Sequence, residues 1–114
     1  MRIVRIEPAP FVLLDATCTA TGTIRRHPEL PWITSASDVT LVSAASAELL
    51  DCAAGMVAPG GLLVFAVCSL EPEEGSEQVA RFLDQRDGFA RVPVTEAELF
   101  GHAEWIDANG DLRT

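Results

Sequence analysis

Two apolar runs, each closed by polar residues, dominate the pattern of this chain. Residues 11–15 read Phe-Val-Leu-Leu-Asp, and residues 62–69 read Leu-Leu-Val-Phe-Ala-Val-Cys-Ser. Continuous apolar runs of this length are typical of strands buried on both faces of a parallel sheet. We therefore expect two strands whose carboxyl ends lie at one edge of one sheet, where ligands bind in open α/β folds.

Helical periodicity follows each of the two runs. Apolar residues recur at three- and four-residue steps from Asp38 to about Val57, which predicts an amphipathic helix that Ser35 or Ser37 caps. After the second run, Pro72 fits the first turn of another helix, and Gly88 is placed to end it. Strands and helices that alternate in this way predict an α/β fold with a mostly parallel sheet.

The ends of the chain carry weaker signals. Residues 2–6 are expected to form an edge strand or a loose arm. Residues 89–94 are predicted as a further strand, residues 95–100 as a short helical turn and residues 103–106 as a weak strand, and Asn109-Gly110 is a turn signal.

Composition narrows the class of protein. The chain has 114 residues, 48% of them hydrophobic, and a formal net charge of −9 from 8 basic and 17 acidic side chains. This length indicates one packed domain, and the acidic balance counts against strong unaided binding to nucleic acid. The sequence shows neither a membrane-spanning run nor a signal peptide, so we expect a cytoplasmic protein.

The three cysteines raise a chemical question. Cys18, Cys52 and Cys68 are 34 and 16 residues apart, which indicates neither a disulfide framework nor a zinc site, so no metal is expected. Cys52 falls within the predicted long helix and is expected to be a small core residue. Cys18 and Cys68 each follow a predicted strand. They are either strand-end core residues or nucleophiles suited to transient addition to an electron-poor ring, with Asp15 holding the ring edge.

One basic cluster, Arg25-Arg26-His27, follows Cys18. It can meet a phosphate, or it is a solvated surface.

Two stretches resemble a known family. The first is Asp15-Ala16-Thr17-Cys18-Thr19-Ala20-Thr21-Gly22-Thr23, followed by Ile24-Arg25-Arg26-His27-Pro28, and it resembles the D-A-P-C-S-[GA]-T-G stretch of the RNA cytosine-C5 methyltransferases of the Sun family, most closely the bacterial 16S rRNA branch. The second, Phe65-Ala66-Val67-Cys68-Ser69-Leu70-Glu71-Pro72-Glu73-Glu74, resembles the family's Y-A-T-C-S-L-x-P-E-E stretch. Gly110-Asp111-Leu112-Arg113-Thr114 also resembles a family motif.

The resemblance implies a partial Rossmann-like, S-adenosylmethionine-dependent methyltransferase fold and a two-cysteine mechanism on rRNA. Cys68 would add to C6 of the target cytosine, and Cys18 would help to release the product. Asp15 would lie where cofactor and base meet, and Arg25 and Arg26 would bind the RNA substrate. DNA cytosine methyltransferases use a cysteine that follows proline, and by that analogy Cys18 would be the attacking residue, but the resemblance favours Cys68.

Departures from the family pattern leave rival hypotheses open. Thr17 and Val67 replace the usual proline and threonine. The match also implies that residues 1–114 are the carboxyl-terminal half of the catalytic domain, without the glycine-rich cofactor loop and the last strand. We therefore expect impaired methyl transfer unless a separate amino-terminal half supplies the rest.

The first rival is a catalytically inactive interaction module, a homo-oligomer that pairs its exposed sheet edges. The second is a thiol redox protein, which would need Cys18 and Cys68 near bonding distance and a lowered thiol pKa.

Overall fold

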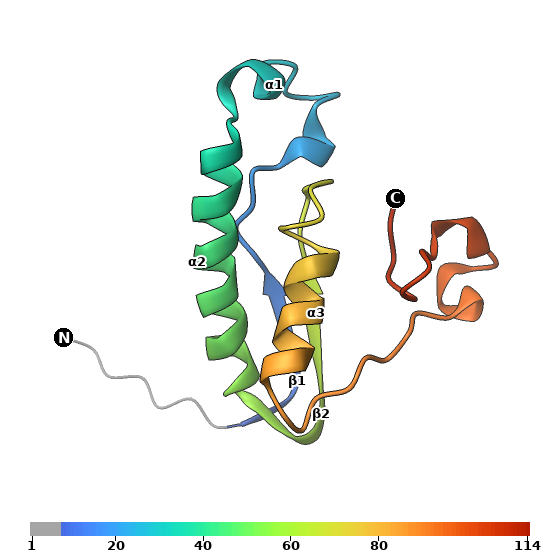
Figure 1. Ribbon diagram of the computed structural model, residues 1–114. Helices are drawn as coiled ribbons and strands as arrows, with labels where there is room; N and C mark the ends of the chain where they lie inside the picture. Colours follow the sequence, from blue (N-terminus) through green and yellow to red (C-terminus); the bar gives the residue numbers. More distant parts are fainter. Residues whose placement is uncertain (1–7) are drawn as a thin grey trace. The chain divides into compact units, whose positions relative to one another are not determined.

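A computed structural model describes residues 8–114 of the chain (Figure 1). The expected edge strand or arm at residues 2–6 lies outside this range. The chain divides into two compact units, Met1–Phe82 and Leu83–Thr114, and the boundary falls inside a helix, α3 (Ser76–Gln85). Within residues 8–114, no helix has the length and apolar character that crossing a membrane requires.

The first unit is built on two parallel strands, as the apolar runs predicted. Strand β1 (Ala9–Asp15) pairs with β2 (Val57–Ala66), with partners that run from Phe11 opposite Leu62 to Asp15 opposite Ala66. β2 begins five residues before the apolar run. It bends at Gly60, where φ is +77°, so the register is irregular at its start. The carboxyl ends of both strands therefore lie at the same edge.

Helix α2 (Ala36–Ala54) connects the two strands and confirms the predicted long helix. Ser35 caps it in a capping box: the Ser35 hydroxyl accepts a hydrogen bond from the Asp38 N–H, and the Asp38 carboxylate accepts one from the Ser35 N–H at 2.8 Å. The Ser35 hydroxyl also donates to the Asp38 carboxylate at 2.6 Å, and this bond, together with the one from the Ser35 N–H, lowers the pKa of Asp38 below its ordinary value. A four-residue helix, α1 (Leu30–Ile33), lies between Pro28 and this cap.

The buried face of α2 differs from the predicted one. The residues that it buries are Ser43, Ser46, Leu50, Ala53 and Ala54. Leu49, one of the apolar residues in the helical pattern from Asp38 to about Val57, is 43% exposed. Cys52 is also exposed, so the prediction that it is a core residue is wrong. Small buried side chains let the helix lie close to its neighbours. Because leucines lie on two sides of the helix, the apolar pattern alone does not show which side is buried.

One face of the sheet is open, which corrects the prediction of strands buried on both faces. Phe11 is 54% exposed, Leu13 60% and Leu62 43%, whereas Val12 and Leu14 on the opposite face are partly covered. Side chains alternate between the faces of a strand, so Phe11 and Leu13 lie on one face of β1. Leu62 is paired with Phe11 and lies on the same face of the sheet. We call the surface formed by Phe11, Leu13 and Leu62 the open sheet face.

The connection from β2 to α3 also differs from the prediction. Residues 72–75 form turns, in which the Gly75 and Glu77 N–H groups donate to the Pro72 carbonyl, and the helix begins only at Ser76. It ends at Gln85, just before Gly88, whose φ of +88° suits a chain reversal. The predicted helix is therefore confirmed, with a later start.

The second unit contains two short 3-10 helices, η2 (Glu96–Leu99) and η3 (Ala103–Trp105). η2 confirms the predicted helical turn. The strand predicted at residues 89–94 is not formed: Pro93 has no N–H to donate, and the Val94 N–H bonds the Gly110 carbonyl at 2.8 Å. The weak strand predicted at residues 103–106 is wrong as well, because most of it is η3.

We expect the open sheet face to cause self-association, since contiguous exposed apolar surface favours burial against another surface. Leu13→Asp should lower the weight-average mass of the chain at high concentration in sedimentation velocity experiments. Leu41→Asp is the matched control, because Leu41 is 70% exposed on α2, away from the sheet. A strictly monomeric unmodified chain at millimolar concentration would contradict this expectation.

Candidate active site

Two loops that follow the paired strands form the site. The Ala16 N–H donates to the Ala66 carbonyl at 2.9 Å and so continues the strand pairing, and the Gly22 N–H donates to the Cys68 carbonyl at 3.0 Å. A Cβ atom at Gly22 would lie 2.7 Å from that carbonyl oxygen, so only glycine allows this approach. The loops therefore run side by side although they are about 50 residues apart in the sequence.

The two loops bring Cys18 and Cys68 into contact. Their Sγ atoms are 3.4 Å apart, within hydrogen-bond distance for sulfur. Cys68 is exposed and Cys18 is partly buried. Burial, and then the hydrogen bond from or to the Cys68 thiol, raise the pKa of Cys18 above its ordinary value of 9.0. The site thus presents one accessible thiol beside a second thiol whose pKa is raised. The close approach of the two sulfurs meets one condition set for a thiol redox protein, but the raised pKa of Cys18 is opposite to the other condition.

A buried carboxylate holds the loops together. Glu74 is fully buried, and its carboxylate accepts three hydrogen bonds: from the Thr19 N–H at 2.7 Å, the Thr19 hydroxyl at 2.6 Å and the Ser69 hydroxyl at 2.5 Å. Thr19 follows Cys18 directly, and Ser69 follows Cys68 directly. Because the same carboxylate binds the neighbour of each cysteine, it fixes the spacing of the two thiols.

Thr21 adds a second connection between the loops. Its Oγ1 accepts a hydrogen bond from the Leu70 N–H at 2.9 Å and lies 3.1 Å from the Ser69 hydroxyl. The Ser69 hydroxyl also accepts a hydrogen bond from the Glu71 N–H at 3.1 Å. The network is therefore continuous from Thr19 to Glu74. We call Thr19, Thr21, Ser69 and Glu74 the loop clamp.

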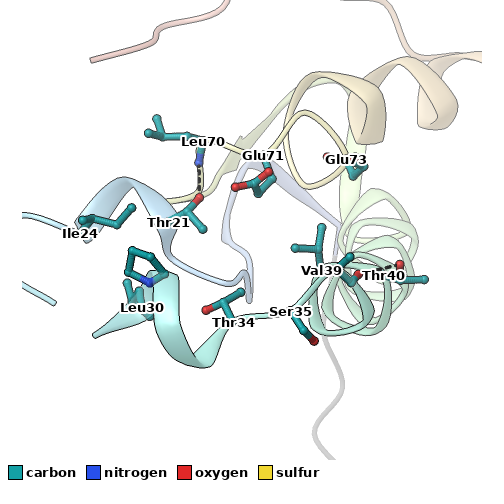
Figure 2. A pocket seen from close by; sticks show the side chains of 12 residues that line it. Thr21, Ile24, Leu30, Thr34, Ser35, Val39, Thr40, Leu70, Glu71 and Glu73 are labelled. Carbon is teal, nitrogen blue, oxygen red and sulfur yellow. Dashed lines mark hydrogen bonds between the residues drawn. The ribbon is translucent and has the colours of Figure 1, made fainter. Parts of the chain in front are cut away.

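A pocket of about 520 Å³ lies next to the loop clamp. Thr21 and Leu70 belong to its wall, and Ile24 and Val39 supply apolar surface. Figure 2 shows the Glu71 side chain between Thr21 and Val39, at one side of this pocket. A pocket that combines apolar surface with polar groups is typical of a ligand site, although neither Cys18 nor Cys68 lines this one.

The other site residues predicted from the sequence are not drawn into this network. Asp15 ends β1 with an exposed side chain, and its carboxylate makes no hydrogen bond or ion pair within residues 8–114. Arg25 and Arg26 are exposed in the turn after η1 (Thr21–Thr23), and neither lines the pocket. The described part of the chain also has no group of three His, Cys, Asp or Glu side chains arranged to hold a metal.

The loop clamp was not predicted from the sequence, which assigned Pro72 to the first turn of a helix and gave Glu74 no role of its own. The available signal was the concentration of hydroxyl residues around both cysteines together with the Glu73-Glu74 pair. Nothing local in that pattern says that one of these carboxylates turns back into the protein.

Most of the chain matches known proteins. The family model of the 16S rRNA methyltransferase RsmB/F matches residues 9–105. The ribosomal RNA small subunit methyltransferase B of Klebsiella pneumoniae subsp. pneumoniae is 44% identical over 90 residues, which cover 79% of this chain and 20% of that protein. The protein of the same name from Cronobacter sakazakii is 46% identical over 109 residues, which cover 83% and 25%.

A solved structure shows the same local fold. The crystal structure of PH0851 matches with a TM-score of 0.74 and 40% identity, over 76% of this chain and 20% of that one. The chain therefore spans about a fifth to a quarter of the length of these relatives.

Loss of the Glu74 carboxylate should loosen the site. We expect Glu74→Gln to lower the free energy of unfolding by about 2 kcal/mol, because an amide nitrogen meets hydroxyl donors that then lose their acceptor in a buried position. Urea unfolding measures this change. Glu73→Gln is the matched control, since Glu73 is exposed and its carboxylate accepts none of these hydrogen bonds. Equal losses in the two variants would contradict the role given to the loop clamp.

Proposed function

The chain belongs to the 16S rRNA methyltransferase RsmB/F family, and from that premise we propose that it carries the reacting thiols for methylation at C5 of a cytosine in rRNA. One observation carries the proposal: Cys18 and Cys68 lie 3.4 Å apart at the carboxyl ends of two paired parallel strands. Two thiols this close can act on the same base. Cys68 is exposed and Cys18 is partly buried, and this difference supports separate roles for the two thiols.

Cys68 is the proposed nucleophile, because it is the exposed member of the pair. Its thiolate forms a bond from Sγ to C6 of the cytosine, which breaks the C5–C6 double bond and places electron density on C5. C5 of free cytosine is a poor nucleophile, so this addition makes the carbon reactive. The exposed position of Cys68 leaves room for a base that has left its stack.

Cys18 is proposed to act in product release. After methylation the proton on C5 must leave, and the C6–Sγ bond must break so that Cys68 is restored. Burial and the neighbouring thiol raise the pKa of Cys18, so its thiolate is a stronger base than an ordinary one. Its sulfur lies beside that of Cys68, and hence beside the base that Cys68 binds.

S-adenosylmethionine is the proposed cofactor and, when bound, supplies an electrophilic methyl group. Asp15 fits a place in its site, because the carboxylate is exposed at the ligand-binding edge of the sheet and makes no hydrogen bond within the described residues. It is therefore available to accept hydrogen bonds from the cofactor and from the exocyclic amino group of the base.

RNA contacts are proposed for Arg25 and Arg26, which are exposed one turn after the loop that carries Cys18. Two arginines position a phosphate but do not overcome a net charge of −9. The matched segment is only a fifth to a quarter of the relatives' length. We therefore assign to these residues a share of the RNA surface, near the target nucleotide.

A second candidate function is association without catalysis. The open sheet face favours it, since Phe11 and Leu13 are more than half exposed. In this alternative the loop clamp preserves the fold, and the chain acts by binding a second copy of itself. The two candidates differ in what they require of Cys68, so a covalent assay separates them.

The covalent assay uses a 16S rRNA fragment and S-adenosylmethionine. Cys18→Ala should accumulate a denaturation-resistant adduct between protein and RNA, because the bond to C6 forms but is not released. Cys68→Ala should form none, and Cys52→Ala, which changes an exposed thiol on α2, should behave as the unmodified chain. A denaturing gel measures all three. Adduct formation by Cys68→Ala would overturn the assigned roles, and no adduct in any variant would favour association.

Cofactor binding is tested separately by isothermal titration with S-adenosylmethionine. Asp15→Asn should weaken binding by about tenfold, because a charge-assisted hydrogen bond is replaced by a neutral one. Glu48→Gln removes one negative charge from an exposed position on α2 and should leave the affinity unchanged. Equal affinity in the Asp15→Asn variant and the unmodified chain would remove Asp15 from the proposed site.

A further inference from the structure

We propose that Cys18 and Cys68 form a reversible intrachain disulfide when the chain meets a peroxide, and that this oxidation switches off the thiol chemistry of the site. The formation of the disulfide follows from the geometry alone. Its effect on methyl transfer rests on the proposed function.

The first argument is distance. The two Sγ atoms are 3.4 Å apart, and a disulfide needs ~2.0 Å, so the sulfurs must approach by little more than a side-chain rotation. Both cysteines lie in loops beyond the ends of β1 and β2, where the backbone can adjust without breaking the strand pairing. The hydrogen bond from Gly22 to the Cys68 carbonyl keeps the two loops together during this adjustment.

The second argument is the difference between the two thiols. Cys68 is exposed, so it meets a dissolved oxidant first, whereas Cys18 is partly buried and its raised pKa makes it slow to react with peroxide directly. In redox pairs one cysteine is oxidised and the other resolves the product. The structure provides an accessible first thiol and a protected second one within contact distance.

The chemistry balances with hydrogen peroxide as the oxidant. The Cys68 thiolate attacks one peroxide oxygen, the O–O bond breaks, and Cys68 becomes a sulfenic acid with release of water once the leaving hydroxide is protonated. Cys18 then attacks the Cys68 sulfur, the S–O bond breaks, and a second water leaves with the proton from Cys18. Two thiols and one peroxide thus give one disulfide and two waters.

The consequence for the site is complete but reversible loss of both thiols. In the disulfide, Cys68 has no free thiolate to add to a base and Cys18 has none to accept a proton. Capture of the sulfenic acid by the neighbouring Cys18 also keeps Cys68 from the sulfinic state, which thiol reductants do not reverse. Cys52 is exposed on α2 and is not part of this pair, so it provides an internal reference.

The test is peroxide oxidation of the Cys52→Ser variant of the 114-residue chain, followed by mass spectrometry. We expect a mass loss of two hydrogen atoms, no free thiol, and full recovery of two thiols with dithiothreitol. Cys18→Ser in the same background should instead gain oxygen on Cys68. Retention of both thiols, sulfinic acid on Cys68, or disulfides only between chains would overturn the proposal.

Peptide mapping of the oxidised, unmodified chain with cyanogen bromide and then a glutamate-specific protease checks the result without any substitution. Cleavage after Met56 separates Cys52 from Cys68, and cleavage after Glu29 and Glu48 separates Cys18 from both. A peptide that contains Cys18 should be linked to one that contains Cys68, and Cys52 should not be linked to either. A link through Cys52 would overturn the proposal.

The adduct assay distinguishes this proposal from the proposed function. A reduced chain that forms the RNA adduct, and loses it on oxidation until dithiothreitol is added, supports both. A disulfide in a chain that forms no adduct when reduced supports the redox pair and contradicts the methyl-transfer proposal. An adduct in a chain that forms no disulfide supports the methyl-transfer proposal and contradicts the redox pair.

Discussion

The buried carboxylate of Glu74 is the constraint on which the site depends. A buried carboxylate is costly unless it accepts hydrogen bonds from the protein, and here Thr19 and Ser69 supply three of them. These donors lie next to the two cysteines in the sequence. The requirement to satisfy one buried acid therefore fixes two loops that have no regular secondary structure of their own, and with them the contact between the thiols.

The site is built at two levels of precision. Parallel pairing of β1 with β2 brings the carboxyl ends of the strands to one edge of the sheet. Cys18 and Cys68 follow these two ends, so they lie in neighbouring loops. The final contact at 3.4 Å then depends on the absence of a side chain at Gly22 and on the loop clamp. Coarse placement is thus a property of topology, and fine placement is a property of hydrogen bonds between loops.

This division explains what the sequence could predict. The strands, the long helix and its Ser35 cap follow from local patterns of apolar and polar residues, and the resemblance to a family singled out both cysteines. The role of Glu74 did not follow, because its partner Thr19 is 55 residues away and no periodicity links them. The same limit explains Cys52: leucines lie on two sides of α2, and the buried side is the one that carries Ser43, Ser46 and Leu50. The Ser43 hydroxyl donates a hydrogen bond to the Glu73 carbonyl, 30 residues away in the sequence. At residues 89–94 the local pattern suited a strand, but Pro93 and a hydrogen bond to Gly110 decided otherwise.

Asp15 connects the reactive edge to the open sheet face. Side chains alternate along β1, so Asp15 shares a face with Phe11 and Leu13, and it is the last residue of the strand, next to the loop that carries Cys18. A polypeptide that covers the apolar surface around Phe11 and Leu13 would therefore lie next to the Asp15 carboxylate and lower its exposure to water. Charge-assisted hydrogen bonds strengthen when water is excluded. Burial of the open sheet face and the ability of Asp15 to hold a ligand are for this reason coupled, whether the covering surface is a second copy of the chain or another polypeptide.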